Sequence, residues 1–573
     1  MRFPHFSSSA QRRTALSVGG LLPASAAREG DFLYTRNTIT EHGILSVHPP
    51  RRALTSAIRG RGLTTARTAA GEQLCYVEGG DLWVGEHRYP LALSDTDHKL
   101  IPFGKRLLIF PERKYLSLND GSHGTLDAAV TTASPTLFTV CRADGTALTP
   151  LNISDAAPQT PMHGDYWLDT AFSPAVLRHY SAAREEWQTL DRTYLRLSCP
   201  AIGLPFRPGD TVCLTGIVPT ELSALNALHR VEDCGEDHLV IAAAPCMTLR
   251  QMAPLTVSRR IPDLDPETVI LCHDRLMGAT IETDENGMET TVIYACRPGD
   301  PFNWEAVDGE QDGARRWRLP YAEPITAAVI YQNQPCFFTE RSLLRLSGQG
   351  ASAHWITQPL EGIRRDCGRS LLAAGRRLYY FTGRRAVVFD GEQVTPLPPT
   401  AHDADIRTAA AGMMDGRYYL SLTDKDGHSQ LLVYQTEDKL WSRLDATRAD
   451  CFAPFCDGLC YRDGCDGTIR SMIAEGEIAP DTAWAAETAP IHLRDSNGRL
   501  SHPELTLIVQ KGARAQILIG CDGMPARQVI ADIVGSDEVP VTIKIHPRAV
   551  SHFTLRFQGT GDVRLVGWHR VSR

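Results

Sequence analysis

The sequence has no apolar run that approaches the roughly 18 residues of a membrane-spanning helix, so we expect no membrane span. It also lacks a surplus of positive charge, since 59 basic residues face 67 acidic ones and the formal net charge is −8. A protein built to grip nucleic-acid phosphates needs a basic face, and this composition argues against that function. The same composition is compatible with a protein that lets DNA slide past, because weak or repulsive contact is useful there.

The chain also lacks the short motifs of common catalytic sites. There is no G-x-S-x-G nucleophile elbow, no phosphate-binding Walker loop and no H-E-x-x-H zinc helix. The 19 histidines are too many and too scattered to single out a general base. The two carboxylates of a glycoside hydrolase would have to come from separate parts of the fold, and spacing cannot pair them. We therefore predict that the chain is not an enzyme, and we nominate no catalytic residue and no cofactor.

The 15 cysteines are odd in number and scattered along the chain. Many fall in expected strands, among them Cys75, Cys213, Cys272, Cys296 and Cys336. This distribution indicates buried, reduced thiols and synthesis in a cytosol, because the disulfide framework of a secreted protein would look different.

One stretch gathers four cysteines within fifteen residues, namely Cys451, Cys456, Cys460 and Cys465. The intervening lengths are four, three and four residues, without the repeated knuckle of a zinc site. We interpret them as structural thiols and nominate no metal ligand, while leaving metal binding open at this stretch.

Two acidic, glycine-containing segments, 424–427 and 463–467, share features with calcium loops. Both lack the further oxygens and the distal bidentate glutamate that a complete calcium loop requires. We interpret both as turns, because aspartate and glycine are typical turn residues.

The most informative stretch is Arg417–Leu444, which reads RYYLSLTDKDGHSQLLVYQTEDKLWSRL. Two β-rich runs, 418–422 and 431–434, flank the polar turn at 424–427, and a second polar turn leads to Trp441. This pattern predicts an antiparallel meander of about three strands. We expect packing roles for Trp304, Trp441 and the Tyr418-Tyr419 pair.

Weaker versions of this meander recur along the chain. Their starts lie near residues 290, 336, 378, 418 and 452, at the spacing of roughly 35–45 residues that is usual for a propeller blade. Hairpins at 74–84 and 106–118 bring the total to about six or seven candidate units. A meander cannot bury its apolar face alone, so the recurrence predicts a radial array of small sheets.

The predicted fold class is all-β: a β-propeller interrupted by a small β-barrel-like insertion and followed by a C-terminal β-sandwich. Long helices are not expected, apart from a short one around 219–228. We expect five parts, which are an N-terminal arm (1–68), the first propeller hairpins (69–130), the inserted barrel-like domain (131–260), the main propeller blades (261–480) and the sandwich (481–573).

Two basic features receive a structural interpretation. Arg12-Arg13 ahead of the apolar stretch 14–27 mimics a twin-arginine export signal, but Gly19, Gly20 and Pro23 interrupt it. We interpret this stretch as an arm that packs on another part of the assembly.

Four arginine-rich spots are interpreted as turn solvation or subunit salt bridges; they are Arg51-Arg52 with Arg59 and Arg61, Arg315-Arg316 with Arg318, Arg364-Arg365, and Arg384-Arg385.

Several phrases resemble a known group of proteins. Tyr294–Val307 (YACRPGDPFNWEAV) resembles the strand–Gly-Asp-Pro–x-x-Trp element of propeller proteins from tailed bacteriophages, and Arg376–Leu397 with Arg417–Leu444 resembles their next blades. Shorter matches occur at Ile109–Leu118 and Pro208–Gly216, and in the arm at Gly30-Asp31-Phe32, Asn37 and Pro50-Arg51-Arg52. The resemblance covers most of residues 1–475. It departs at Gln435, where Asp is usual, and at His48-Pro49, where a Tyr is usual.

This group is similar in architecture to the tail-nozzle and packaged-DNA-stabilisation proteins of phage virions. The resemblance implies a structural virion protein at the head–tail junction or tail, present as a homo-oligomeric ring that forms a channel, nozzle or hub. The implied partners are further copies of the chain, the portal, an adaptor or other tail proteins, with passing contact to ejected genomic DNA. The implied location is the virion, after synthesis in the host cytoplasm.

Two other classes stay open at the level of the sequence. The aromatic-rich insertion, with Tyr166, Trp167, Tyr180 and Trp187, and the C-terminal sandwich allow a receptor- or carbohydrate-binding adhesin at a tail tip. A propeller hydrolase would need carboxylates or histidines that converge near the propeller axis. The number of blades and the number of copies are also open.

Overall fold

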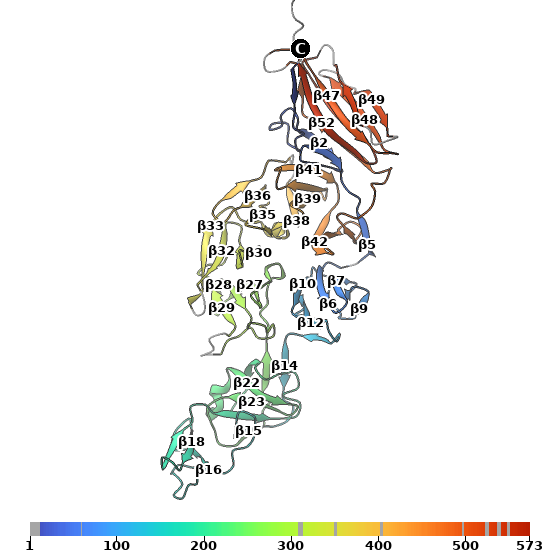
Figure 1. The fold of residues 1–573 in the computed structure, drawn as a ribbon. Coiled ribbons are helices and arrows are strands. Elements are labelled where there is room, and N and C mark those ends of the chain that lie inside the picture. The colour runs from blue at the N-terminus through green and yellow to red at the C-terminus, as the bar shows by residue number, and fades with distance from the viewer. Residues whose placement is uncertain are drawn as a thin grey trace, which may run out of the picture. The chain divides into compact units, whose positions relative to one another are not determined.

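The computed structural model describes residues 12–58, 60–307, 313–348, 352–400, 405–494, 498–521, 527–535, 540–546 and 550–572. Its regular structure is almost entirely strand (Figure 1). The helical segments in this part of the chain are short 3-10 turns: η1 (Thr220–Leu225), η2 (Pro266–Thr268) and η4 (Arg365–Ser370). No helix among them has the length and apolar character needed to cross a membrane. The predicted all-β fold is confirmed.

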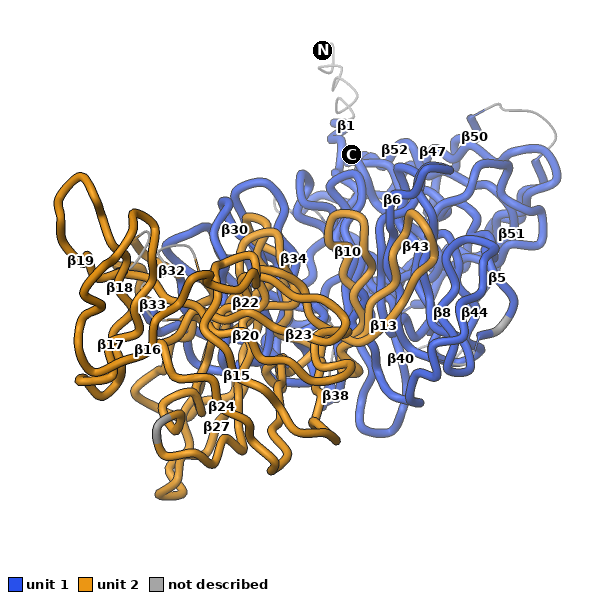
Figure 2. Tube along the Cα trace, turned by 90° about the horizontal axis from the view of Figure 1, so that it is seen from below, with its two compact units in different colours: residues 1–100, 325–345, 356–573 blue, residues 101–324, 346–355 orange. Residues whose placement is uncertain are grey.

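The chain forms two compact units, shown in blue and orange in Figure 2. Unit 1 comprises residues 1–100, 325–345 and 356–573, and unit 2 comprises residues 101–324 and 346–355. Seven antiparallel sheets of four strands have the order expected of propeller blades, and five of them lie mainly in unit 1. The sequence therefore predicted the blade-type sheets correctly.

Unit 1 holds five blade sheets. Their strands are β6 (Leu63–Thr68), β7 (Gly71–Glu78), β8 (Asp81–Val84) and β9 (His87–Tyr89); β30 (Ala327–Tyr331), β31 (Gln334–Phe338), β32 (Ser342–Ser347) and β33 (His354–Pro359); β34 (Leu372–Ala374), β35 (Arg377–Phe381), β36 (Ala386–Phe389) and β37 (Val394–Pro396); β38 (Ile406–Met414), β39 (Arg417–Asp424), β40 (Ser429–Gln435) and β41 (Leu440–Asp445); and β42 (Ala449–Phe455), β43 (Gly458–Asp463) and β44 (Thr468–Ser471) with β5 (Arg52–Ala57).

The first turn of several blades explains part of the sequence pattern. Between the first and second strands, pairs of residues adopt positive φ, as at His273-Asp274, Gln332-Asn333 and Cys456-Asp457. Two consecutive residues in this conformation make the type I′ turn that matches the twist of a hairpin. Cys456 is thus a turn residue, and this position accounts for its exposure.

The meander at 417–444 packs as the sequence predicts. Trp441 is 1% exposed, donates from its indole Nε1 to the Pro398 carbonyl at 3.0 Å, and lies 4.9 Å from the Tyr434 ring. Tyr418 and Tyr419 are fully buried on opposite sides of β39, in two separate clusters of apolar side chains. These aromatic side chains bury large apolar areas, so they stabilise the blade by packing.

The last blade is completed by the N-terminal part of the chain. β5 pairs with β44 in antiparallel register, with Ala53 opposite Arg470 and Arg52 opposite Ser471. Without β5 this sheet would keep three strands and would expose the edge of β44. A strand from residues 52–57 therefore closes a sheet that otherwise belongs to residues 449–471.

The sandwich in unit 1 combines both ends of the chain. One sheet has the order β3-β4-β52-β47-β50 with β1 beside β52, and the other has the order β2-β45-β51-β48-β49 with β46 beside β51. Its strands are β1 (Arg12–Ala15), β2 (Phe32–Arg36), β3 (Thr38–Glu41), β4 (Ile44–Val47), β45 (Ala483–Thr488), β46 (Ile491–His492), β47 (Ser501–Val509), β48 (Arg514–Cys521), β49 (Gln528–Val534), β50 (Val541–Lys544), β51 (His552–Thr560) and β52 (Val563–Ser572).

The expected separate arm at 1–68 is not found in the described residues. Residues 12–47 supply four strands to the sandwich, β5 completes a blade and β6 begins another. Phe32 and Trp568 are both nearly fully buried and meet edge to face with ring centroids 6.4 Å apart. The alternation of apolar and polar residues marked these strands, but strand partners far apart in sequence cannot be deduced from it.

Unit 2 holds two blade sheets and the inserted domain. The blade strands are β10 (Lys99–Phe103), β11 (Arg106–Phe110), β12 (Lys114–Ser117) and β13 (His123–Thr125), and β26 (Ile270–Cys272), β27 (Arg275–Thr283), β28 (Glu289–Ala295) and β29 (Arg315–Arg318). Trp304 lies between β28 and β29, is 2% exposed and donates to the Pro301 carbonyl at 2.8 Å.

The insertion consists of an eight-stranded sheet and a smaller four-stranded sheet. The larger one has the order β14 (Ala128–Thr131), β25 (Thr256–Arg259), β21 (Thr211–Thr215), β22 (Leu228–Gly235), β23 (His238–Ala242), β20 (Tyr194–Ser198), β15 (Thr136–Cys141) and β24 (Leu249–Gln251). The smaller one, called the tip sheet below, has the order β16 (Leu151–Ser154), β17 (Tyr166–Asp169), β18 (Val176–Ser181) and β19 (Glu186–Thr189).

A buried ion pair holds the insertion where it leaves and rejoins the blade sheets of unit 2. Arg259, at the end of β25, pairs with Asp210, and the two side chains are 5% and 2% exposed. Arg259 also donates to the Leu126 carbonyl at 3.2 and 3.3 Å and lies 4.9 Å from the centre of the Phe302 ring. Asn303 donates to Asp210 at 3.3 Å, so both charged groups have further polar partners.

Candidate functional site

Charged residues from separate blades of unit 1 meet in one group, which we call the arginine–aspartate cluster. Its members are Arg61, Asp97, Arg369, Arg448, Asp450 and Arg462. Most precede or begin the first strand of a blade: Arg61 lies before β6, Asp97 before β10 and Arg369 before β34, and Asp450 is the second residue of β42. Four blades thus contribute charged side chains at or near their first strands, and Arg462 comes from β43.

Each carboxylate of this cluster is held by two guanidinium groups. Asp97 accepts from Arg61 at 3.2 Å and from Arg369 at 2.9 Å. Asp450 accepts from Arg448 at 3.1 Å and from Arg462 at 2.7 Å. Arg369 also donates to the Asp450 carbonyl at 3.4 Å and so links the two halves. With four arginines and two aspartates the cluster is formally cationic, which suits contact with an anionic group.

Sequence reasoning did not find this cluster. Its members are spread from residue 61 to residue 462, and nothing in their spacing links them. The signal that could have found them is positional: the residues just before the first strand of each repeat become neighbours once the blades are side by side.

Cys451 lies beside the arginine–aspartate cluster but is not an activated nucleophile. Burial is the main cause that raises the pKa of its thiol to about 11, against the lowering influence of Arg369. A thiol of that pKa is protonated at neutral pH, and only the thiolate is reactive.

The four cysteines of the 451–465 stretch are not gathered around one point in the fold. Among the described residues, one group alone brings at least three metal-ligand atoms together, and it contains no cysteine. Cys460 points into the core and burial raises its pKa to about 12, whereas Cys456 and Cys465 are exposed. Their interpretation as structural or turn residues agrees with these positions.

We expect the difference in exposure among these cysteines to determine how fast each thiol is labelled in the native chain. Cys456 and Cys465 should react rapidly with a thiol reagent at pH 8, while Cys460 should react only after denaturation, because it is buried and protonated. Cys456→Ser and Cys465→Ser variants should each remove one fast-reacting thiol. If all four cysteines are protected until a chelator is added, they bind a metal and this assignment is wrong.

Within the described ranges, the candidate group of metal ligands is Asp424, Asp426 and His428, in the turn for which the sequence predicted turn chemistry. Asp424 Oδ1 already accepts from the backbone N–H groups of Asp426 at 2.9 Å and His428 at 2.8 Å. Asp426 and His428 are exposed. These hydrogen bonds give Asp424 a structural role in stabilising its turn. The segment at 463–467 is stabilised in the same way, because Asp463 accepts from the Cys465 N–H at 2.9 Å.

Each of three arginine-rich spots contains at least one arginine that forms an ion pair within the chain, and Arg59 lies outside the described residues. Arg51 pairs with Asp445 at 3.0 Å, Arg316 with Glu282, and Arg385 with Glu361. Arg364 donates to the backbone carbonyls of residues 406 and 407. These contacts fit the expected structural interpretation, with partners in the same chain for these four arginines.

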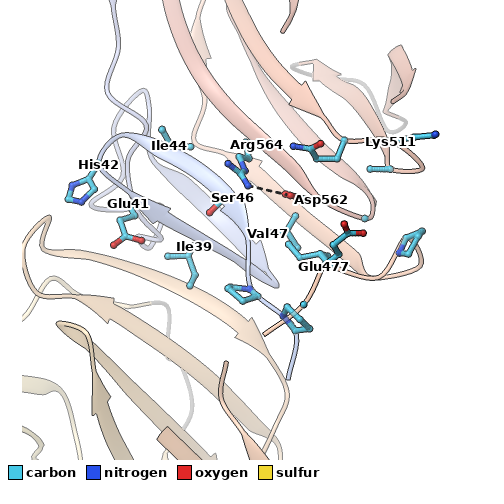
Figure 3. A pocket seen from close by; sticks show the side chains of 18 of the residues that line it. Ile39, Glu41, His42, Ile44, Ser46, Val47, Glu477, Lys511, Asp562 and Arg564 are labelled. Carbon is cyan, nitrogen blue, oxygen red and sulfur yellow. Dashed lines mark hydrogen bonds and ion pairs between the residues drawn. The ribbon is translucent and has the colours of Figure 1, made fainter. Parts of the chain in front are cut away.

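A cavity of about 1070 Å³ lies in unit 1 and is shown in Figure 3. Its walls come from β3 and β4, the Pro49-Pro50 pair, residues 476–480, the turn at 510–513 and the start of β52. Two ion pairs line it: Arg417 with Glu41 at 2.7 Å, and Arg564 with Asp562 at 3.4 Å. An apolar floor with both signs of charge suits an amphipathic ligand or peptide segment. Sequence reasoning did not find this cavity, because five separate segments line it.

Next to this cavity in sequence lies His48, one of the positions where the sequence departs from the phage-like pattern. His48 is 1% exposed and its Nδ1 lies 2.6 Å from the Pro49 carbonyl. Burial, helped by the nearby Arg51, lowers its pKa to about 3. The imidazole is therefore neutral in the folded chain at any pH above that value.

We expect His48 to make the fold acid-sensitive. Between pH 6.5 and about 3 the unfolded chain binds a proton on this imidazole and the folded chain does not, so stability falls as pH falls through that window. A His48→Tyr variant, which carries the residue usual in the resembling group, should gain about 1.4 kcal/mol relative to the parent on going from pH 7.5 to 5.5. Urea unfolding at both values measures this, with exposed His87→Gln as control. An equal pH response of parent and His48→Tyr would contradict it.

The tip sheet carries the aromatic residues noted in the sequence. Trp187 lies 5.5 Å from Trp167 and 5.3 Å from Tyr180, measured between ring centroids. Strand register puts Trp167, Arg178 and Thr189 on one face, together with Tyr180 and Trp187. The other face presents the buried Leu168 and Leu177 to the core of the insertion.

The aromatic face of the tip sheet also carries a charged pair, Arg178 and Asp169. Arg178 lies 5.5 Å from the centre of the Trp167 ring and pairs with Asp169 at 3.1 Å. Phe172, in the loop after β17, is 53% exposed. Tyr166 belongs to the opposite face, where it lies 5.5 Å from His179. Three of the four aromatic residues named from the sequence thus share one face, and the fourth does not.

Comparison with known proteins gives matches only among solved structures. No protein-family model matches the chain, and neither does any curated protein. Among solved structures, the exo-β-1,3-galactanase of Phanerochaete chrysosporium with β-1,3-galactotriose matches at 9% identity and a TM-score of 0.22, covering 52% of this chain and 95% of that one. The same enzyme with galactose matches at 10% identity and a TM-score of 0.22, over 52% and 95%. A further glycoside hydrolase matches at 10% identity and a TM-score of 0.22, over 53% and 96%.

These matches correct one prediction. The chain was expected not to be an enzyme, and the structures that match it are glycoside hydrolases, so that prediction is contradicted and withdrawn. It rested on the absence of short catalytic motifs, which is uninformative for a fold whose catalytic carboxylates come from different blades. At this identity and TM-score the matches carry no argument about the reaction or substrate of this chain.

Proposed function

We propose that the chain is a structural subunit of a tailed-phage virion, located at the head–tail junction or in the tail, where copies assemble into a ring. The sequence resemblance across most of residues 1–475 suggests this role. The observation that supports it best in the fold is the interlocking of the two ends of the chain, which suits a part that bears load.

The interlock has two components. β1 pairs with β52 along its whole length, from Arg12 opposite Ser572 to Ala15 opposite His569. β5 then completes the blade of β42–β44. Residues near the start of the chain therefore hold both the sandwich and the last blade closed, and neither opens without loss of main-chain hydrogen bonds along a strand.

Native mass spectrometry of the full chain tests the assembly. We expect a closed ring with one defined number of copies at micromolar concentration, either alone or after mixing with portal and adaptor proteins. A chain that stays monomeric under both conditions would contradict the proposed function.

A second candidate function is carbohydrate binding by the tip sheet. The face with Trp167, Tyr180 and Trp187 combines aromatic rings with the charged pair Arg178–Asp169. Aromatic rings with a few placed polar groups are the usual lining of small-ligand sites. This candidate keeps the chain in a virion, as a receptor-binding part of the tail.

A glycan-array screen with the full chain tests this second candidate. We expect binding by the parent and its loss in Trp187→Ala, since that ring touches both other aromatic groups of the face. The matched control is Trp83→Ala, which removes a half-buried aromatic ring from a blade. No binding by the parent, or equal binding by both variants, would remove carbohydrate recognition at this face.

A further inference from the structure

The two lateral edges of the sandwich differ in whether another part of the unit covers them. At one edge, β2 and β3 lie against β41 of the neighbouring blade in the same unit. At the opposite edge, β49 pairs with β48 on one side, and no strand of the described part of the chain pairs with its other side. Figure 1 shows β49 at the outer margin of the sandwich, in red.

The side chains of β49 are unusually apolar for a free edge. Its sequence is QVIADIV, and Val529, Ile530 and Val534 are 55%, 39% and 69% exposed. Natural edge strands are normally short, charged or covered, because their unpaired N–H and C=O groups recruit other strands. Three exposed branched apolar residues on such a strand mark an interaction surface.

A bulge places two of these residues on the same face. The register shifts between Ile517 and Leu518, so that Leu518 lies opposite Val529 and Ile517 opposite Ala531. Ile530 is the extra residue of the bulge. Val529 and Val534 therefore both point to the outer face of the sheet, one near each end of the strand.

The charge of β49 is already neutralised. Asp532, its single acidic residue, accepts from Arg514 at 2.8 Å and from Gln516 at 3.0 Å on the adjacent strand. Two β49 strands can thus approach each other without two unpaired carboxylates meeting. In an antiparallel pair, Val529 of one strand would come toward Val534 of the other, apolar on apolar.

We propose that β49 pairs edge to edge, in antiparallel fashion, with β49 of a second copy of this chain. The inference deepens the proposed function, on which it rests, by naming one contact of the assembly. Such a contact is two-fold symmetric and uses the same surface on both copies. A ring that contains it holds an even number of copies.

Charge substitutions on β49 test the contact in the full chain. In the parent we expect assemblies with an even number of copies. The double variant Val529→Lys with Val534→Lys places like charges across the two-fold axis, and should raise the dissociation constant of this contact by at least about 100-fold. The matched control, Val218→Lys with Met288→Lys, adds the same charge at side chains that are 68% and 64% exposed elsewhere, and should assemble as the parent does. Unchanged assembly of the β49 variant would overturn the proposal.

Hydrogen exchange on the unmodified chain gives a readout that does not depend on how the variants fold. The amides of β49 should exchange more slowly in a concentrated sample than in a dilute one, because a second strand protects them. Equal exchange at both concentrations would overturn the contact. Large assemblies in which the β49 amides are not protected from exchange would contradict this contact but not the proposed function. A monomer at every concentration would contradict both the contact and the proposed function.

Discussion

A chain that begins at residue 59 is expected to lose its cooperative fold. The deletion removes β1–β4 from the sandwich, with the buried Val18, Phe32, Leu45 and Val47, and removes β5 from the last blade. Burying each such side chain contributes roughly 1.5–3 kcal/mol, so the loss from these four side chains alone is comparable with the typical stability of about 5–15 kcal/mol of a domain. Thermal unfolding and the soluble yield measure the effect.

The control for this deletion is a chain that begins at residue 12, which keeps every described strand. It should unfold as the full chain does. Addition of residues 12–58 as a separate peptide during refolding should restore part of the soluble yield of the longer deletion. A soluble chain from residue 59 with an unchanged unfolding transition would contradict the interlock.

Removal of the Asp210 carboxylate is expected to cost about 3–5 kcal/mol, the largest effect of a single substitution that we anticipate. Asp210→Ala leaves the Arg259 guanidinium buried without its counter-charge, with the Leu126 carbonyl and the Phe302 ring still beside it. The free energy of unfolding in urea, followed on the transition of unit 2, measures the loss.

A double variant separates the buried charge from simple loss of packing. Asp210→Ala with Arg259→Met removes both charges, and should recover much of the stability that the single variant loses. Asp155→Ala, at an exposed side chain of the same unit, serves as the control and should leave the unfolding transition almost unchanged. Additive losses in the double variant would show that the pair is not coupled and would contradict the role assigned to it.

Local pattern predicted much of the fold. The alternation of residues and the polar turn at 424–427 located β39 and β40, and Trp441 was correctly expected in the packed interior. The spacing of the meanders indicated blade-type sheets, of which the described part of the chain contains seven. These features are visible in sequence because a hairpin and its turn involve neighbouring residues.

Features that depend on partners far apart in sequence could not be predicted. The residues of β5 predict a short strand, whether that strand belongs to an arm or to a blade. Nothing in these residues identifies β44 as the partner strand. The arginine–aspartate cluster escaped for the same reason, since Asp97 and Asp450 meet only through the arrangement of blades around Arg369. The aromatic face of the tip sheet was half predicted: its residues were named, but register, not spacing, placed Tyr166 on the other face.

The proposed virion role is tested most directly by quantitative mass spectrometry of purified phage particles from the strain that encodes this chain. The account predicts that the chain is present in a fixed ratio to the major capsid protein, at several copies per particle, and that it stays with the particles after washing in high salt. Absence of the chain from washed particles, or a ratio that varies between preparations, would contradict it.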